Sequence, residues 1–163
     1  AVLVSTHGMD VTGQRQADAY RPKKDAWVLA PHGRGTHAFN WQGPGHWNAL
    51  EALAFLHQRS TELWGAAYAA PPSRGVIYTG HSNGGFGAIL LASHSPGTAL
   101  GVAPLAGMPT LGEDGRGVLS YPADPLLLSI LDASLSEYRT DLLVSNLKGV
   151  PFLARTGADD TTI

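Results

Sequence analysis

Residues 80–84 read Gly-His-Ser-Asn-Gly and stand between two apolar segments. The short, β-branched segment 76–79 predicts a buried strand, and segment 85–94 predicts a helix packed closely on a sheet. A sharp turn between the two would strain the backbone of Ser82 and lift its Oγ clear of the sheet. Side chains at positions 80 and 84 would then clash with neighbouring backbone, so glycine fits there. The alternative is an ordinary glycine-rich turn with a solvated serine, but both flanks favour the strained strand-turn-helix unit.

Strand and helix patterns alternate along the whole chain. Strands separated by helices predict one α/β domain, built as a mostly parallel sheet with helices on both faces. Glycine and proline recur between residues 107 and 124, which predicts irregular structure, and 107–147 is a candidate cap or lid. The expected strands are 1–5, 26–30, 76–79, 100–105 and 150–155, and the expected helices are 14–20, 48–64, 85–94, 126–135 and 138–147.

Composition excludes several classes of function. The chain has 163 residues, of which 44% are hydrophobic and 15% charged, and a formal net charge of −2. That charge gives no reason to expect a nucleic acid or an anionic membrane as a partner. The absence of cysteine excludes disulfides, thiolate metal sites and a cysteine nucleophile. No apolar run reaches the roughly 18 residues of a membrane span, and Ala1 begins a strand-like segment without a signal-peptide pattern. Compartment and oligomeric state stay open.

Reactive side chains in a parallel sheet belong on loops at the carboxyl ends of the strands, and three loops qualify. The first carries Ser82 as candidate nucleophile, with the backbone N–H of Asn83 directed at a developing oxyanion. The second is His7-Gly8-Met9, after the first strand, where the N–H of Met9 is the other oxyanion donor. The alternative, that His7 is a base or metal ligand, is less consistent with its position, because nearby backbone can satisfy its ring.

The third loop, after the last predicted strand, carries Asp159 and Asp160. A nucleophilic serine needs a carboxylate to orient its base, and two adjacent aspartates give one candidate too many. Asp160 lies three residues after Gly157, past the turn, and is the preferred acid. Asp159 is then a turn former whose side chain caps local backbone. The alternative is that both are solvated loop acids.

Three motifs in this order resemble the α/β-hydrolase superfamily: His7-Gly8, the stretch 80–85, and the stretch 157–163. The chain is most similar to the catalytic domain of prolyl-oligopeptidase-type serine hydrolases, and to related esterases such as the dienelactone hydrolases. The second glycine after the serine, Gly85, and the pair Arg34-Gly35 favour the peptidase branch, although the arginine motif is weak.

This resemblance implies a complete list of site residues. Ser82 would be the nucleophile and Asp160 the acid of a Ser-Asp-His triad, with oxyanion N–H groups from Asn83 and Met9. It implies no cofactor and no metal ion. The substrate would be a small-molecule ester or a peptide, and the main expectation is a peptidase of the prolyl-oligopeptidase kind. The alternatives are a carboxylesterase or thioesterase of the same fold, and a catalytically silent binding or scaffold protein.

The sequence departs from that family pattern at both ends. No histidine follows Asp160, and the family core has strands before residue 1 and after residue 163. We therefore expect a fold incomplete at both ends, with the catalytic histidine beyond the chain end and a 1–163 chain that is inactive alone. Residues 1, 26, 76, 100 and 150 would open the third to seventh strands of the fold.

The histidines within the chain are weaker candidates for the base. His94 is the only one after Ser82, yet it lies about 18 Å away along a helix that leaves the site. His81 adjoins the nucleophile, but neighbours on a turn point apart. Three further histidines flank a glycine-rich loop, namely His32, His37 and His46. They could line a substrate cleft. They could also hold a zinc ion, although their spacing matches no recognised zinc motif.

Overall fold

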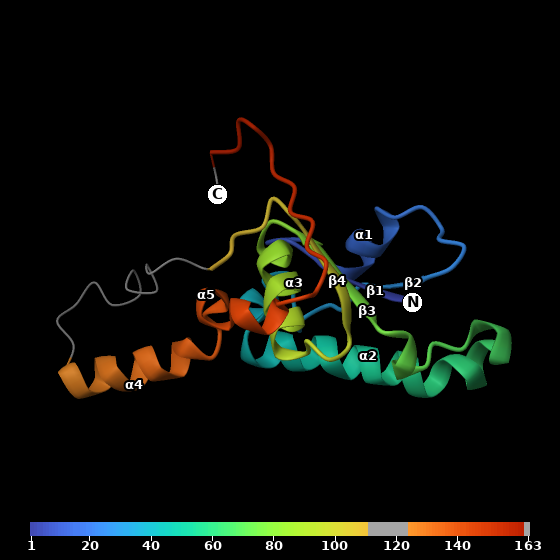
Figure 1. Ribbon diagram of the computed structural model, residues 1–163, viewed down its shortest axis with the longest axis horizontal. Coiled ribbons are helices and arrows are strands. Elements are labelled where there is room, and N and C mark those ends of the chain that lie inside the picture. Colours follow the sequence, from blue (N-terminus) through green and yellow to red (C-terminus); the bar gives the residue numbers. More distant parts are fainter. Residues whose placement is uncertain (111–123, 162–163) are drawn as a thin grey trace.

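A four-stranded parallel sheet forms the centre of the computed structural model, which describes residues 1–110 and 124–161 (Figure 1). The strand order is β2-β1-β3-β4, and each neighbouring pair is parallel. Parallel neighbours require crossover connections, which the intervening helices supply. The strands are β1 (Val2–Thr6), β2 (Trp27–Leu29), β3 (Val76–His81) and β4 (Ala99–Leu105).

Helices cover both faces of this sheet. Figure 1 shows α1 on one side of the strands and α2 on the other. This arrangement confirms the predicted three-layer α/β architecture. The α-helices are α1 (Gly13–Asp18), α2 (Gly43–Trp64), α3 (Asn83–His94), α4 (Pro125–Ser136) and α5 (Thr140–Leu143). Short 3-10 turns span Ala38–Trp41, Ala66–Tyr68, Pro72–Arg74 and Val144–Leu147.

Helix α3 is the centre of the core. Its residues from Asn83 to Ser93 are all buried, as expected for a helix that is apolar around its whole circumference. Trp41 is fully buried against it, and Gly87 leaves the space that this indole ring fills. The strands contribute mainly β-branched side chains to the same cluster, namely Val2, Val4, Val76 and Val102.

Most element boundaries differ by one or two residues from the sequence prediction, and three helices need comment. Helix α2 begins at Gly43 rather than at residue 48, because Pro44 in the first turn needs no N–H partner there. Helix α3 begins at Asn83 rather than at residue 85, directly after the strained serine. The predicted helix 138–147 is instead the short helix α5 followed by the 3-10 turn Val144–Leu147.

The predicted last strand, 150–155, is not a regular strand. Only two isolated bridges join it to β4, between Val102 and Phe152 and between Leu105 and Arg155. Proline has no N–H to donate, so Pro151 contributes only its carbonyl, which accepts from the N–H of Val102 at 2.9 Å. The segment still runs parallel to β4 along the edge of the sheet.

The candidate cap, 107–147, is described only in part, because residues 111–123 lie outside the described residues. Helix α4 has no buried residue, and Figure 1 shows it extending away from the body of the molecule. Its cap Asp124 accepts a hydrogen bond from the N–H of Leu126 at 2.8 Å. A role of this region as a lid stays a prediction.

Backbone contact fixes the first turn of α3 against the end of β1. A Cβ at Gly84 would overlap the carbonyl groups of Thr6 and His7, and one at Gly80 would overlap the carbonyl of Gly84. The hydroxyl of Thr6 lies within hydrogen-bond distance of the carbonyls of Thr79 and Gly84, which share its one proton, and so joins β1, β3 and α3. The structure thus confirms that positions 80 and 84 have no room for a side chain.

Gly84→Ala should therefore lower the melting temperature of the full natural chain strongly. Overpacking costs typically about 1–3 kcal/mol, and the clash here is with backbone that cannot rotate away. Gly97→Ala is the matched control, because a Cβ at Gly97 would meet nothing within 4 Å. Thermal unfolding followed by circular dichroism checks both variants. Equal melting temperatures for the two would contradict the close approach.

Candidate active site

Ser82 lies between β3 and α3 in a conformation that L-residues rarely adopt, with φ 56° and ψ −125°. Its N–H donates to the carbonyl of Leu105 at 2.9 Å, and its carbonyl accepts from the N–H of Gly85 at 2.7 Å. These bonds hold the backbone in the strained region that functional turns use. The side chain is only half-buried, so Oγ is accessible at the carboxyl edge of the sheet.

The loop after β1 lies directly beside Ser82. An ideal Cβ on Gly8 would stand 3.5 Å from Cβ of Ser82 and 3.1 Å from the carbonyl oxygen of His81. β1 lies between β2 and β3 in the sheet, so the chain leaves β1 toward one side and leaves β3 toward the other. Ligands of open parallel sheets bind in the crevice at such a switch point. The lack of a side chain at Gly8 permits this close approach.

Two backbone N–H groups at this crevice are free to bind an anion. Within the described residues, neither the N–H of Asn83 nor that of Met9 has an acceptor. The N–H of Asn83 also lies at the positive end of α3. The side chain of Asn83 is buried, and neither of its polar atoms has a partner in the part of the chain that is described. The geometry is thus compatible with the predicted oxyanion donors, whose role stays a prediction.

His7 shapes this loop and does not face the serine. Its ring is fully buried, with Nδ1 2.9 Å from the carbonyl oxygen of Gly8 and Nε2 3.0 Å from that of His32. The ring also packs edge-on against Trp41, whose Nε1 donates to the carbonyl of His7 at 3.1 Å. Both ring nitrogens are therefore occupied by backbone, which favours the structural interpretation of His7 over the catalytic one.

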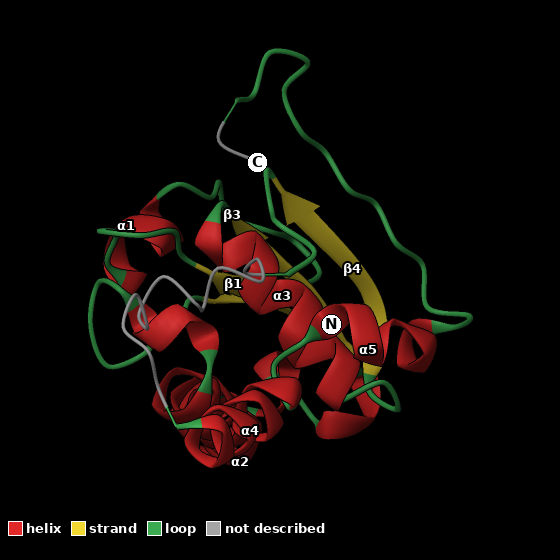
Figure 2. Ribbon diagram, turned by 90° about the vertical axis from the view of Figure 1, so that its left-hand side faces the viewer, coloured by secondary structure: helices red, strands yellow, loops and turns green. Residues whose placement is uncertain are grey.

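Asp160 lies just after a turn that begins at Gly157. Its N–H donates to the carbonyl of Gly157 at 3.3 Å, and its side chain is half-buried, whereas Asp159 is exposed. Figure 2 shows the loop 156–161 arching beyond the carboxyl end of β4, the same edge of the sheet that carries Ser82. The assignment of Asp160 as the acid stays a prediction.

The other histidines have positions that sequence reasoning described only in part. His94 ends α3, as predicted far from the elbow, the sharp turn at residues 80–84, and its Nδ1 lies 3.0 Å from the carbonyl of Leu90. His46 packs against His94 with ring centroids 5.0 Å apart, so its predicted place in a substrate cleft is wrong. Burial, with a smaller contribution from the charge of His94, lowers the pKa of His46 to about 4. His37 instead binds the carboxylate of Asp10 at 2.8 Å.

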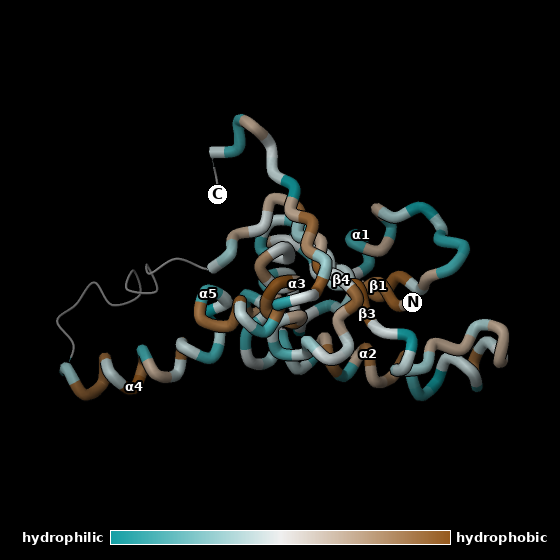
Figure 3. The backbone as a smooth tube through the Cα atoms, in the orientation of Figure 1, coloured by the Kyte–Doolittle hydropathy of each residue, from teal (hydrophilic) through white to brown (hydrophobic). Residues whose placement is uncertain are grey.

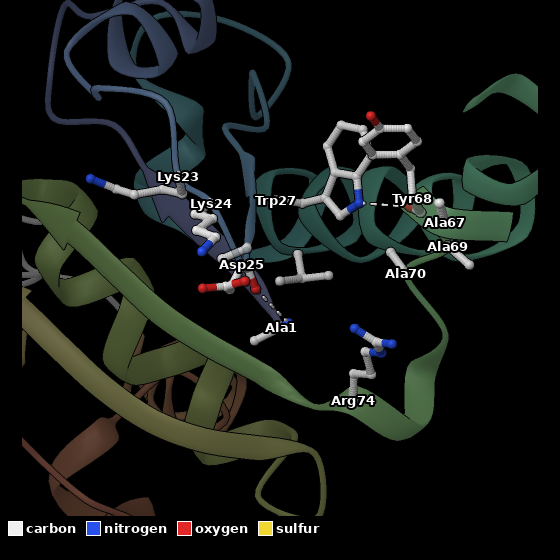
Figure 4. A pocket seen from close by; sticks show the side chains of 12 residues that line it. Ala1, Lys23, Lys24, Asp25, Trp27, Ala67, Tyr68, Ala69, Ala70 and Arg74 are labelled. Atoms are coloured by element: carbon white, nitrogen blue, oxygen red, sulfur yellow. Dashed lines mark hydrogen bonds between the residues drawn. The ribbon is translucent and has the colours of Figure 1, made fainter. Parts of the chain in front are cut away.

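Two cavities open on opposite edges of the sheet. One of about 380 Å³ lies at the amino ends of β1 and β2, where Figure 4 shows Trp27 hydrogen-bonded to the backbone of Tyr68. It is far from the loops that carry reactive groups in a parallel sheet. The other, of about 630 Å³, is lined by Met9, His81 and Leu105, all direct neighbours of the elbow. This second cavity is the candidate substrate cleft.

Thr6 and Trp41 were not singled out from the sequence, although both hold the site together. A polar residue at the end of a buried strand, directly before the His-Gly pair, is the only local signal for Thr6.

Residues 1–110 and 124–161 contain no group of three metal-ligating side chains, and none of their helices is long and apolar enough to cross a membrane.

Comparisons with known proteins give partial likenesses in sequence and extensive ones in structure. No family model matches the chain. An uncharacterized secreted protein of Arthroderma benhamiae is 31% identical over 87 residues, which are 53% of this chain and 9% of that protein. S-formylglutathione hydrolase FrmB of Staphylococcus aureus matches with a TM-score of 0.64 and 17% identity, over 98% of this chain and 62% of that one. This chain thus spans less than two thirds of FrmB.

Two further hydrolases give similar matches. The fluorophosphonate-binding serine hydrolase FphF of Staphylococcus aureus has a TM-score of 0.54 and 13% identity, over 98% of this chain and 76% of that one. An S-formylglutathione hydrolase of Agrobacterium tumefaciens has a TM-score of 0.54 and 21% identity, over 99% of this chain and 66% of that one. Likeness at these identities establishes architecture rather than activity. With its parallel sheet and its strained serine between β3 and α3, the chain has the α/β-hydrolase fold.

Proposed function

We propose that the full protein is a serine esterase that cleaves a carboxylic ester or thioester by acyl transfer through Ser82. The observation that carries the proposal is the elbow itself. A strained, accessible serine stands at the switch point of the sheet, beside two backbone N–H groups without acceptors in the described part of the chain. That combination supplies a nucleophile and an oxyanion site within one crevice.

The reaction follows from the positions of these groups. Oγ of Ser82 attacks the substrate carbonyl carbon and forms a C–O bond, while its proton passes to the base. The carbonyl oxygen becomes an oxyanion held by the N–H groups of Asn83 and Met9. The bond to the leaving group then breaks, and the leaving group takes the proton. Water attacks the acyl-serine by the same route and releases the acid.

The base comes from a residue outside those described. The ring nitrogens of His7 lie against backbone carbonyls, and the ring of His37 lies against Asp10, so neither histidine is placed to take the proton of Ser82. In this fold the triad follows the order serine, acid, histidine along the chain. We therefore place the histidine after Asp160, with Asp160 orienting it. A silent binding protein of the same fold would have no such histidine.

The comparisons favour an esterase over a prolyl-oligopeptidase-type peptidase. Two of the structural neighbours are S-formylglutathione hydrolases and the third is a serine hydrolase, and none is a prolyl-oligopeptidase-type peptidase. Gly85, taken from the sequence as a sign of the peptidase branch, has a packing reason of its own. A Cβ at Gly85 would stand 2.5 Å from Cα of Gly107, so the close approach of the loop after β4 requires glycine there. Peptidase activity stays a prediction without structural support.

Ser82 should react with a fluorophosphonate probe in the full natural chain, because only an activated serine displaces fluoride at a useful rate. Ser82→Ala should abolish labelling, as measured by mass spectrometry of the tryptic peptides. Ser73→Ala is the control, since Ser73 is an exposed serine remote from the elbow in the sequence. Labelling that persists at another serine in the Ser82→Ala variant would end the proposal.

Asp160→Asn should lower kcat by about 10⁴-fold with a p-nitrophenyl ester, since a neutral amide no longer holds the base in its working tautomer. Asp159→Asn is the matched control and should cost less than about tenfold, because the exposed side chain makes no interaction specific to the transition state. Steady-state kinetics of the two variants decide the assignment. A larger loss at Asp159 would show that the acid is misassigned.

A further inference from the structure

The candidate substrate cleft combines apolar and charged side chains in one lining. Its apolar members include Met9, 45% exposed, and Leu105, 36% exposed, and His81 lines it as well. Helix α1 contributes Arg15 to the same lining. A substrate group that fills the cleft therefore meets both apolar surface and a guanidinium.

The side chains around Arg15 leave its charge unpaired. The carboxylate of Asp10, on the same cleft, already binds His37 at 2.8 Å. The carboxylate of Asp18, on the same helix, accepts a hydrogen bond from Gln14 at 2.8 Å. Within residues 1–110 and 124–161, no carboxylate pairs with the guanidinium of Arg15.

The helix that carries Arg15 is anchored, so the backbone of Arg15 has a defined place beside the cleft. The N–H of Arg15 donates to Oγ1 of Thr12 at 3.1 Å, which caps α1. Nε2 of Gln16 donates to Oγ of Ser5 at 2.8 Å, and that same hydroxyl lies 2.8 Å from the hydroxyl of Tyr20. These bonds tie α1 to β1, the strand that leads into the loop with Gly8 and Met9.

We propose that the substrate is an ester with a carboxylate several bonds from the scissile carbonyl, and that Arg15 binds this carboxylate. A guanidinium group can bind a carboxylate through two parallel hydrogen bonds. The contact then has geometric specificity in addition to charge attraction. The apolar side chains of Met9 and Leu105 in the same lining suit a short hydrocarbon chain between the two groups. This inference rests on the proposed esterase function and names its substrate class.

The test compares neutral and carboxylated esters with the full natural chain. One arm places the charge in the acyl half, with p-nitrophenyl hemiglutarate against p-nitrophenyl butyrate. The other places it in the alcohol half, with 4-carboxyphenyl butyrate against 4-acetylphenyl butyrate. In each arm, kcat/KM for the charged ester is divided by kcat/KM for the neutral ester. This ratio cancels general effects of a substitution on folding or on the nucleophile.

In one of the two arms, Arg15→Gln should lower this ratio about tenfold, the loss expected for a hydrogen bond to a charged group. Arg15→Lys should restore part of it, since the charge returns without the planar fork. Arg21→Gln is the matched control, because it removes the same charge from an exposed residue that does not line the cleft. Its ratio should stay at the wild-type value.

Two results would overturn the inference. An unchanged ratio for Arg15→Gln in both arms, with butyrate still cleaved through Ser82, would remove the role of Arg15 and leave the esterase standing. An equal fall for Arg21→Gln would show that the effect is general attraction by a positive surface. No hydrolysis of any of the four esters by the wild type would overturn the proposed function and this inference with it.

Discussion

The backbone of Gly84 lies against the carbonyl groups of Thr6 and His7, and this contact sets the distance between β1 and the first turn of α3. Everything at the crevice depends on it. The loop after β1 can reach Ser82 only because no side chain separates the two backbones there. The hydroxyl of Thr6 then fixes their relative position through its bonds to Thr79 and Gly84. A buried polar side chain that joins three elements specifies one arrangement, because every alternative leaves its donor unpaired.

That arrangement explains why a strained serine persists. The conformation of Ser82 costs energy, and the surrounding structure offsets it through the bond from its N–H to Leu105 and through the burial of α3 behind it. The N–H groups of Met9 and Asn83, which we propose as the oxyanion donors, have no acceptor among the described residues. Preorganised donors of this kind need no rearrangement when charge develops, which is the reason they lower a barrier.

The elbow and the alternation of strands with helices could be predicted from the sequence because both depend on local signals. The spacing of Gly80, Ser82 and Gly84 specifies a turn, and strands separated by helices indicate parallel neighbours. The pairing of His46 with His94 could not be predicted, because it joins two helices far apart in the chain. The cleft was missed for the same reason. Its walls come from the loop after β1, from α1 and from the end of β4, and no sequence motif indicates that these segments lie together.

The most direct test of the crevice is a crystal structure of the full natural chain after reaction with a phosphonate ester that mimics the tetrahedral intermediate. The phosphonate should be bonded to Oγ of Ser82. One of its oxygens should lie about 2.7–3.1 Å from the backbone nitrogens of both Asn83 and Met9. An adduct on a different serine, or a phosphonyl oxygen that contacts neither nitrogen, would contradict the active site described for this fold.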